Sequence, residues 1–156
     1  MKNTFILLAI TLFTFSFSSC SDDESTPEPT VDIRDQIVGT YTSVATILYL
    51  DGSPAESESG TIKIEKGTVT DKIIFFEDGE IIANGTVGGV VFDLEDMSKT
   101  EDGVLYESKG VDEYTLTDGT KYHGGYNKDT NEIIFNIDIY ADGTRIAKIE
   151  YVLTKI

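Results

Sequence analysis

Two alternating segments joined by an Asp-Gly pair constrain the fold of this chain more than any other feature. In residues 132–141 and again in residues 144–154, apolar and polar side chains alternate with a period of two, which is typical of half-buried strands. Asp142-Gly143 between them can take the positive φ angles of a tight turn. The sequence therefore predicts an antiparallel hairpin with one apolar face. That face carries Phe135, Ile137, Ile139, Ala147, Ile149, Tyr151 and Leu153.

The rest of the chain from residue 37 onward shows the same period and no convincing helical one. Segments rich in Ile, Val, Thr, Tyr and Phe alternate with turn pairs such as Asp78-Gly79. Only Asp93–Asp102 leaves room for a single helical turn. The predicted strands are residues 38–50, 59–66, 68–76, 80–87, 89–94, 103–108, 111–117, 120–126, 132–141 and 144–154.

This order of strands predicts an all-β domain. The 156-residue length favours one folded domain, over residues 37–156. Short connections favour an antiparallel meander, and closure of about eight strands into a barrel removes exposed edges. We therefore expect an eight-stranded β-barrel, with a two-layer β-sandwich as the alternative. An eight-stranded barrel encloses an interior that side chains fill or that holds one small ligand.

The first residues have the layout of a secretory signal peptide. Met1-Lys2-Asn3 supplies a positive charge, an apolar run follows from Phe5 to Phe15, and the small residues Ser18 and Ser19 precede Cys20. The apolar run is shorter than the roughly 20 residues that a membrane-spanning helix needs. We predict a signal peptide at residues 1–19. An ordinary secreted protein with an incidental cysteine is the alternative.

Phe17-Ser18-Ser19-Cys20 resembles a bacterial lipobox, in which the cysteine is acylated and becomes the mature N-terminus. The acidic run behind it, Ser21–Glu24, is similar to that of many Bacteroidetes-type surface lipoproteins. This resemblance implies lipidation at Cys20 and attachment to the outer membrane through the N-terminal lipid. The domain would then face the cell surface, or alternatively the periplasm. Residues 20–36 have no hydrophobic run, so we expect a lipidated, acidic, extended tether.

A second resemblance concerns the folded domain. Gly39-Thr40-Tyr41 stands where lipocalins have their Gly-x-Trp motif, and residues 37–156 are similar in length and strand order to the calycin-like or lipocalin-like domains of Bacteroidetes lipoproteins. The resemblance implies a calycin-like barrel. In lipocalins a basic residue late in the chain packs across the tryptophan, and Arg145 is the late arginine here.

Charge and composition argue against several function classes. The formal charge of −16 repels phosphate backbones, so we expect no nucleic-acid partner. One cysteine and one histidine, His123, provide neither a nucleophile–base pair nor a zinc ligand set. We therefore expect no enzyme, no catalytic residues, no cofactor and no metal. A calcium site in the acidic loop Asp93–Asp102 remains the weaker alternative to a solvated loop.

These observations favour a non-enzymatic cell-envelope lipoprotein that binds a small apolar ligand within its barrel. The candidate ligand-binding residues are Phe135, Ile137, Ile139, Ile149, Tyr151 and Leu153. The alternative is a surface adhesion or complex-forming module that binds a protein or glycan through its outer face and loops. Its eight tyrosines could serve as contact anchors on a rigid sheet.

Overall fold

The computed structural model describes residues 31–156, which form one compact unit. The predicted signal peptide, Cys20 and the first part of the tether lie outside the described residues. No helix in the described part is long and apolar enough to cross a bilayer. The elements are η1 (Ile33–Gln36), β1 (Gly39–Tyr49), β2 (Glu56–Lys66), β3 (Lys72–Glu77), β4 (Glu80–Gly88), β5 (Val91–Leu94), β6 (Met97–Glu101), β7 (Val104–Val111), β8 (Tyr114–Thr115), β9 (Lys121–Tyr122), β10 (Gly124–Asn127), β11 (Glu132–Ala141) and β12 (Thr144–Lys155).

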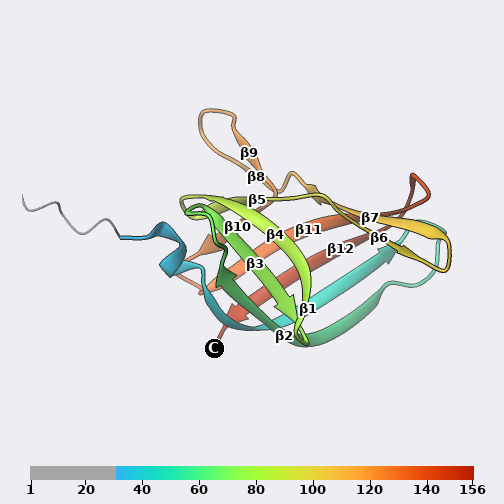
Figure 1. Cartoon of the computed structure of the whole chain (residues 1–156), viewed down its shortest axis with the longest axis horizontal. Coiled ribbons are helices and arrows are strands. Elements are labelled where there is room, and N and C mark those ends of the chain that lie inside the picture. The colour runs from blue at the N-terminus through green and yellow to red at the C-terminus, as the bar shows by residue number, and fades with distance from the viewer. Residues whose placement is uncertain (1–30) are drawn as a thin grey trace, which may run out of the picture. The chain divides into compact units, whose positions relative to one another are not determined.

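Eight of these strands close into an antiparallel β-barrel (Figure 1). Hydrogen-bonded neighbours follow the order β10-β5-β4-β3-β2-β1-β12-β11, and β11 pairs with β10 to complete the ring. The predicted all-β barrel is confirmed, and the sandwich alternative is not what the chain forms. The order departs from a meander once, because β10 rather than β6 lies beside β5.

The strands β6 to β9 are additions to the barrel. Because the first half of β11 pairs with β10 and the second half with β7, the β6–β7 hairpin extends the sheet away from the ring. The short hairpin of β8 and β9 projects from the barrel wall (Figure 1). Residues 93–102, where the sequence left room for a helical turn, contain the end of β5 and all of β6. The polar strand β6 forms because β7 supplies its hydrogen bonds.

The hairpin of β11 and β12 forms as predicted, with a register shift between Ile139 and Tyr140. Phe135 pairs with Tyr151 and Ile137 with Ile149, so their side chains share the inner face of the barrel. Asp142 and Gly143 both have positive φ, at 46° and 77°, as the tight turn requires. Alternation and the Asp-Gly turn were sufficient to predict this hairpin, because both strands lie next to their turn in the sequence.

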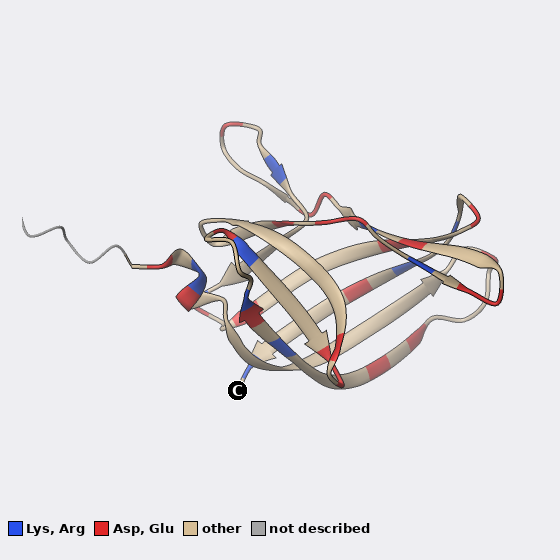
Figure 2. Cartoon of the chain, viewed as in Figure 1, with Lys and Arg blue, Asp and Glu red and all other residues tan. Residues whose placement is uncertain are grey.

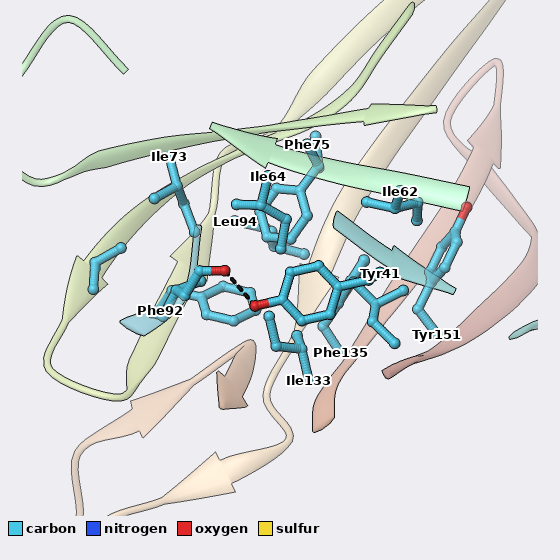
Figure 3. Close-up of a cluster of buried hydrophobic side chains, with 14 of the residues drawn as sticks. Tyr41, Ile62, Ile64, Ile73, Phe75, Phe92, Leu94, Ile133, Phe135 and Tyr151 are labelled. Carbon is cyan, nitrogen blue, oxygen red and sulfur yellow. Dashed lines mark hydrogen bonds between the residues drawn. The ribbon is translucent and has the colours of Figure 1, made fainter. Parts of the chain in front are cut away.

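One end of the barrel interior is filled by aromatic and branched side chains (Figure 3). Phe75 lies with its ring centroid 5.5 Å from that of Phe92 and 5.2 Å from that of Phe135. Tyr41 is completely buried there, and its hydroxyl donates a hydrogen bond to the carbonyl of Ile37. A Cβ at position 124 would come within 2.3 Å of the Phe92 ring, so Gly124 is needed for this packing.

The helix η1 lies inside the segment that the sequence assigned to an extended tether. Arg34 is only 8% exposed, and its Nη1 donates to the carbonyl oxygens of Gly67, Val69 and Lys72 at the β2–β3 turn. Asp32 forms an ion pair with Arg34 at 2.6 Å. A buried arginine and three carbonyls therefore order residues 32–36, which have no hydrophobic run to do so. The expectation of a tether reaching residue 36 was wrong at this end.

Candidate functional site: a cavity at the open end of the barrel

The end of the barrel opposite η1, here called the open end, holds a cavity of about 370 Å³. It lies among the second half of β1, the start of β2, the β3–β4 turn and the middle of β12. Small ligands occupy cavities of roughly 300–1,000 Å³, so this volume is within the useful range. The lining residues are Ala45, Ile47, Glu58, Ser59, Gly60, Glu77, Asp78, Ile82, Ile149 and Tyr151.

Small residues at inward positions explain why the interior stays open here. Ala45 on β1 and Gly60 on β2 line the cavity. Gly60 pairs with Ser43, another small residue, which is only 2% exposed. At the filled end, the corresponding inward positions carry Tyr41 and Ile62. The smaller side chains at these positions leave the space of the cavity.

The cavity has an aliphatic wall and an aromatic floor. Ile82 and Ile149 are partly buried side chains that pack against the core and also line the cavity. Tyr151 stacks on Phe135, with ring centroids 4.7 Å apart and ring planes at 15°. Figure 3 shows Tyr151 at the margin of the buried cluster. An apolar group entering from the open end therefore meets side chains held by the core.

Three carboxylates stand at the same cavity. Glu58 and Asp78 are exposed, and Glu77 is half-buried. Burial, together with the negative charges of Asp78 and Glu58, raises the pKa of Glu77. Figure 2 shows acidic residues along β2 and at the β3–β4 turn. The mouth of the cavity is thus a region of negative potential.

The missing side chain of Gly60 leaves space for the Glu77 carboxylate. A Cβ at position 60 would lie 2.9 Å from Oε1 of Glu77 and 3.2 Å from Oγ of Ser43. Since both atoms approach the backbone so closely, only a glycine admits them without displacement. The φ angle at Gly60 is not in the left-handed region, so space rather than conformation demands glycine here.

Two of the six predicted ligand-binding residues line the cavity, namely Ile149 and Tyr151. Phe135, Ile137 and Leu153 share their face but belong to the filled core, with exposures of 0%, 6% and 0%. Ile139 lies further along β11, where it lines a separate groove of about 200 Å³ beside β6 and β7. The apolar face is therefore divided between core, cavity and groove.

The carboxylates of the cavity were missed at the level of sequence, although a signal for them exists. Glu58 is in phase with Ile62 and Ile64, the inward residues of β2. Glu77 is in phase with Ile73 and Phe75, the inward residues of β3. Charged residues on the inward phase of two adjacent strands indicate a solvated section of the interior.

The cation over Tyr41 is Lys155, not Arg145. The Lys155 ammonium lies 5.7 Å from the centroid of the Tyr41 ring, and it donates a hydrogen bond to the carbonyl of Gln36 at 3.1 Å. Arg145 instead pairs with Asp138. Arg145 lies at the start of β12, and Lys155 lies at its end.

His123 has a structural contact outside the cavity. Its Nδ1 accepts a hydrogen bond from the backbone N–H of Leu94 at 2.9 Å. The side chain packs so closely on Gly110 that a Cβ there would lie 2.2 Å from Nδ1. His123 therefore links the segment after β9 to β5 and β7. Among residues 31–156, no three His, Cys, Asp or Glu side chains are grouped as metal ligands.

Comparisons with known proteins include a distant likeness of fold. No family model matches the chain, and no curated protein matches it. A solved structure of a protein of unknown function from the DUF3598 family of Nostoc punctiforme is similar, with a TM-score of 0.40 and 11% sequence identity. The match covers 78% of the present chain and 48% of the Nostoc protein, so the present chain spans about half the length of the Nostoc protein.

Proposed function

We propose that this chain is a non-enzymatic cell-envelope lipoprotein whose barrel binds a small ligand in the cavity at its open end. The single observation that carries the binding role is that cavity, about 370 Å³ in volume and floored by Tyr151. The filled end of the barrel supplies a rigid core that needs no ligand to hold it together. A preformed site beside an independent core is what a binding protein requires.

A matched pair of substitutions on β1 tests the binding role. Ala45 lines the cavity, and its neighbour Val44 points outward and is 46% exposed. Ala45→Phe fills the cavity, whereas Val44→Phe adds the same ring outside the barrel. We expect eight-carbon probes, namely octanol and octylammonium, to raise the melting temperature of the natural protein and of Val44→Phe only. Equal shifts in both variants would place binding elsewhere.

The proposal includes binding without turnover. Among the residues that line the cavity there is no His or Cys, and the hydroxyl groups belong to Ser59 and Tyr151. The lining residues therefore cannot form a Ser–His or Cys–His pair. The ligand recovered after prolonged incubation is expected to have its original mass. A changed mass would contradict the non-enzymatic part of the proposal.

Attachment to the membrane rests on the sequence before the barrel. The chain is expected in the membrane fraction, with lipid mass on the peptide that contains Cys20. Cys20→Ala is expected to release the protein; full membrane retention of this variant with the same lipid mass would reject the lipoprotein assignment. Removal of the domain by protease from intact cells would support the surface orientation, and protection would support the periplasmic one.

The adhesion alternative has its own surface. Leu105 and Tyr106 on β7 are 41% and 37% exposed, and Tyr106 lines the groove beside β6. Under this alternative, Tyr106→Ser would abolish retention of a glycan or protein partner. Ala45→Phe would leave that retention unchanged. The reverse pattern would favour the cavity.

A further inference from the structure

We propose that the open-end cavity selects amphipathic organic cations, with a primary ammonium group at Glu58 and Glu77 and a hydrocarbon chain against the aliphatic wall. This inference rests on the proposed ligand-binding function and names the chemical class of the ligand. It replaces the purely apolar ligand that the sequence favoured.

The cavity carries negative charge that no ion pair compensates in the described part of the chain. Glu58, Glu77 and Asp78 meet at one cavity, and none of them takes part in the ion pairs formed among residues 31–156. Other acidic residues of the domain do have such partners, for example Glu95 with Lys72. Burial, and repulsion by the negative charges of Asp78 and Glu58, disfavour the ionised form of Glu77 and raise its pKa. A bound cation would relieve this repulsion.

Tyr151 brings a hydroxyl group to the same cavity. This residue is only 8% exposed and lines the cavity. Its hydroxyl takes part in none of the side-chain hydrogen bonds formed among residues 31–156. In this part of the chain every completely enclosed side-chain polar atom has a hydrogen-bond partner, so the Tyr151 oxygen is not completely enclosed. It is free to accept a hydrogen bond from water or from a ligand.

The number of acceptors fits a primary ammonium. Such a group has three N–H donors and no acceptor. The carboxylates of Glu58 and Glu77 and the hydroxyl oxygen of Tyr151 offer acceptors at the same cavity. A quaternary ammonium would lack the donors, and a carboxylate ligand would add a further negative charge. The cavity therefore favours the primary ammonium over both.

The cavity also offers an apolar surface for the rest of the ligand. Ile47, Ile82 and Ile149 form an aliphatic wall with Ala45 between the carboxylates and the core. Each methylene that leaves water for this wall adds to the affinity. An inorganic cation or a short polar amine would leave the aliphatic wall in contact with water. The combination of acidic mouth and aliphatic wall selects an amphipathic molecule.

The test compares three probes of equal chain length: octylammonium, octanol and octanoate. Isothermal titration calorimetry with the purified protein at neutral pH and low salt is expected to give octylammonium at least about tenfold higher affinity than octanol. Octanoate is expected to bind most weakly. The preference for octylammonium should decline with added salt, since the carboxylates are partly exposed.

Charge-neutralising variants show which carboxylates cause the preference for octylammonium. The double substitution Glu58→Gln/Glu77→Gln is expected to reduce octylammonium affinity to that of octanol, with octanol affinity unchanged. Asp129→Asn is the matched control, since Asp129 is exposed and lies at the β10–β11 turn, at the opposite end of the barrel. It is expected to retain the tenfold preference. Tyr151→Phe is expected to retain octanol binding and lose part of the preference.

The outcomes separate the two proposals. Equal binding of octanol and octylammonium, unaffected by the double variant, would overturn the cation preference and leave the binding cavity in place. No binding of any probe, with no change in melting temperature, would overturn the cavity function itself. Binding of calcium chloride that displaces octylammonium and depends on Glu58 and Glu77 would replace the organic cation with a metal ion.

Discussion

Tyr151 stacks on Phe135 across the β11–β12 pair, with ring centroids 4.7 Å apart, and this contact separates the filled end of the barrel from its open end. Phe135 is completely buried in the core. Tyr151 covers it and also lines the cavity. The same side chain therefore contributes to stability through its ring and to binding through its hydroxyl.

These two contributions can be separated. Tyr151→Phe keeps the stacked ring, so we expect stability within about 1 kcal/mol of the natural protein. Tyr151→Ala opens the core and is expected to cost roughly 3–5 kcal/mol. Urea unfolding followed by circular dichroism measures both values. A loss of stability in Tyr151→Phe as large as that in Tyr151→Ala would mean that the hydroxyl has a partner in the folded barrel.

Much of the barrel could be predicted from local sequence, and its interior could not. The β11–β12 hairpin was predictable because alternation and the Asp142-Gly143 turn are both local signals. β6 was missed because residues 97–101 lack apolar alternation, and their strand exists only through pairing with β7. The ordered helix η1 was missed because Arg34 is fixed by carbonyls more than thirty residues away.

The cavity required knowledge of how inward positions of different strands line up. Ala45, Gly60 and Glu77 come from three strands, and only the register of the barrel brings them together. The apolar face of β11 and β12 was predicted correctly, yet sequence alone could not show where its neighbours are large enough to fill the space.

The half-buried carboxyl of Glu77 is expected to make stability depend on pH. Burial and the charges of Glu58 and Asp78 raise its folded pKa, so the folded protein keeps this proton to a higher pH than the unfolded chain does. Stability is therefore lost as the pH rises from the unfolded value, about 4.3, through the folded one. Glu77→Gln removes this loss and is expected to melt at a higher temperature at neutral pH.

The comparison of melting temperatures across pH checks this prediction. The advantage of Glu77→Gln should disappear below about pH 4, where Glu77 is protonated in both states. Tyr151, which lines the same cavity, stays neutral throughout because burial raises its pKa to about 12. A variant that is less stable than the natural protein at neutral pH would show that the Glu77 carboxylate has a stabilising partner.

Gly60→Ala should disturb the site and spare the fold. The added methyl group would lie 2.9 Å from the Glu77 carboxylate, which sits at the end of a flexible side chain and can move away. We expect a near-natural melting temperature and a weaker preference for octylammonium over octanol. Calorimetric titration and thermal unfolding of the same sample measure the two effects. An unchanged preference would mean that the position of Glu77 does not matter for binding.

The contact of η1 with the β2–β3 turn predicts a response to acid. Hydrogen bonds from Arg34 and Lys66 hold the pKa of Asp32 well below its usual range. Its stabilising contribution is therefore complete above the unfolded value of about 3.9 and is lost as the pH falls toward the lower folded value. Asp32→Asn should lower the melting temperature at neutral pH and have little effect in strong acid. An effect that is equal at both pH values would contradict this assignment.

Chemical-shift mapping of a bound probe tests the location of the site most directly. In a ¹⁵N-labelled sample titrated with octylammonium, the amide signals expected to move are those of Ala45, Ile47, Gly60, Ile149 and Tyr151. The amides of Phe92 and Ile133, at the filled end, should stay in place. Shifts confined to Met97 and Tyr106 in the groove beside β6, or no shifts at all, would contradict the conclusion that the open-end cavity is the binding site.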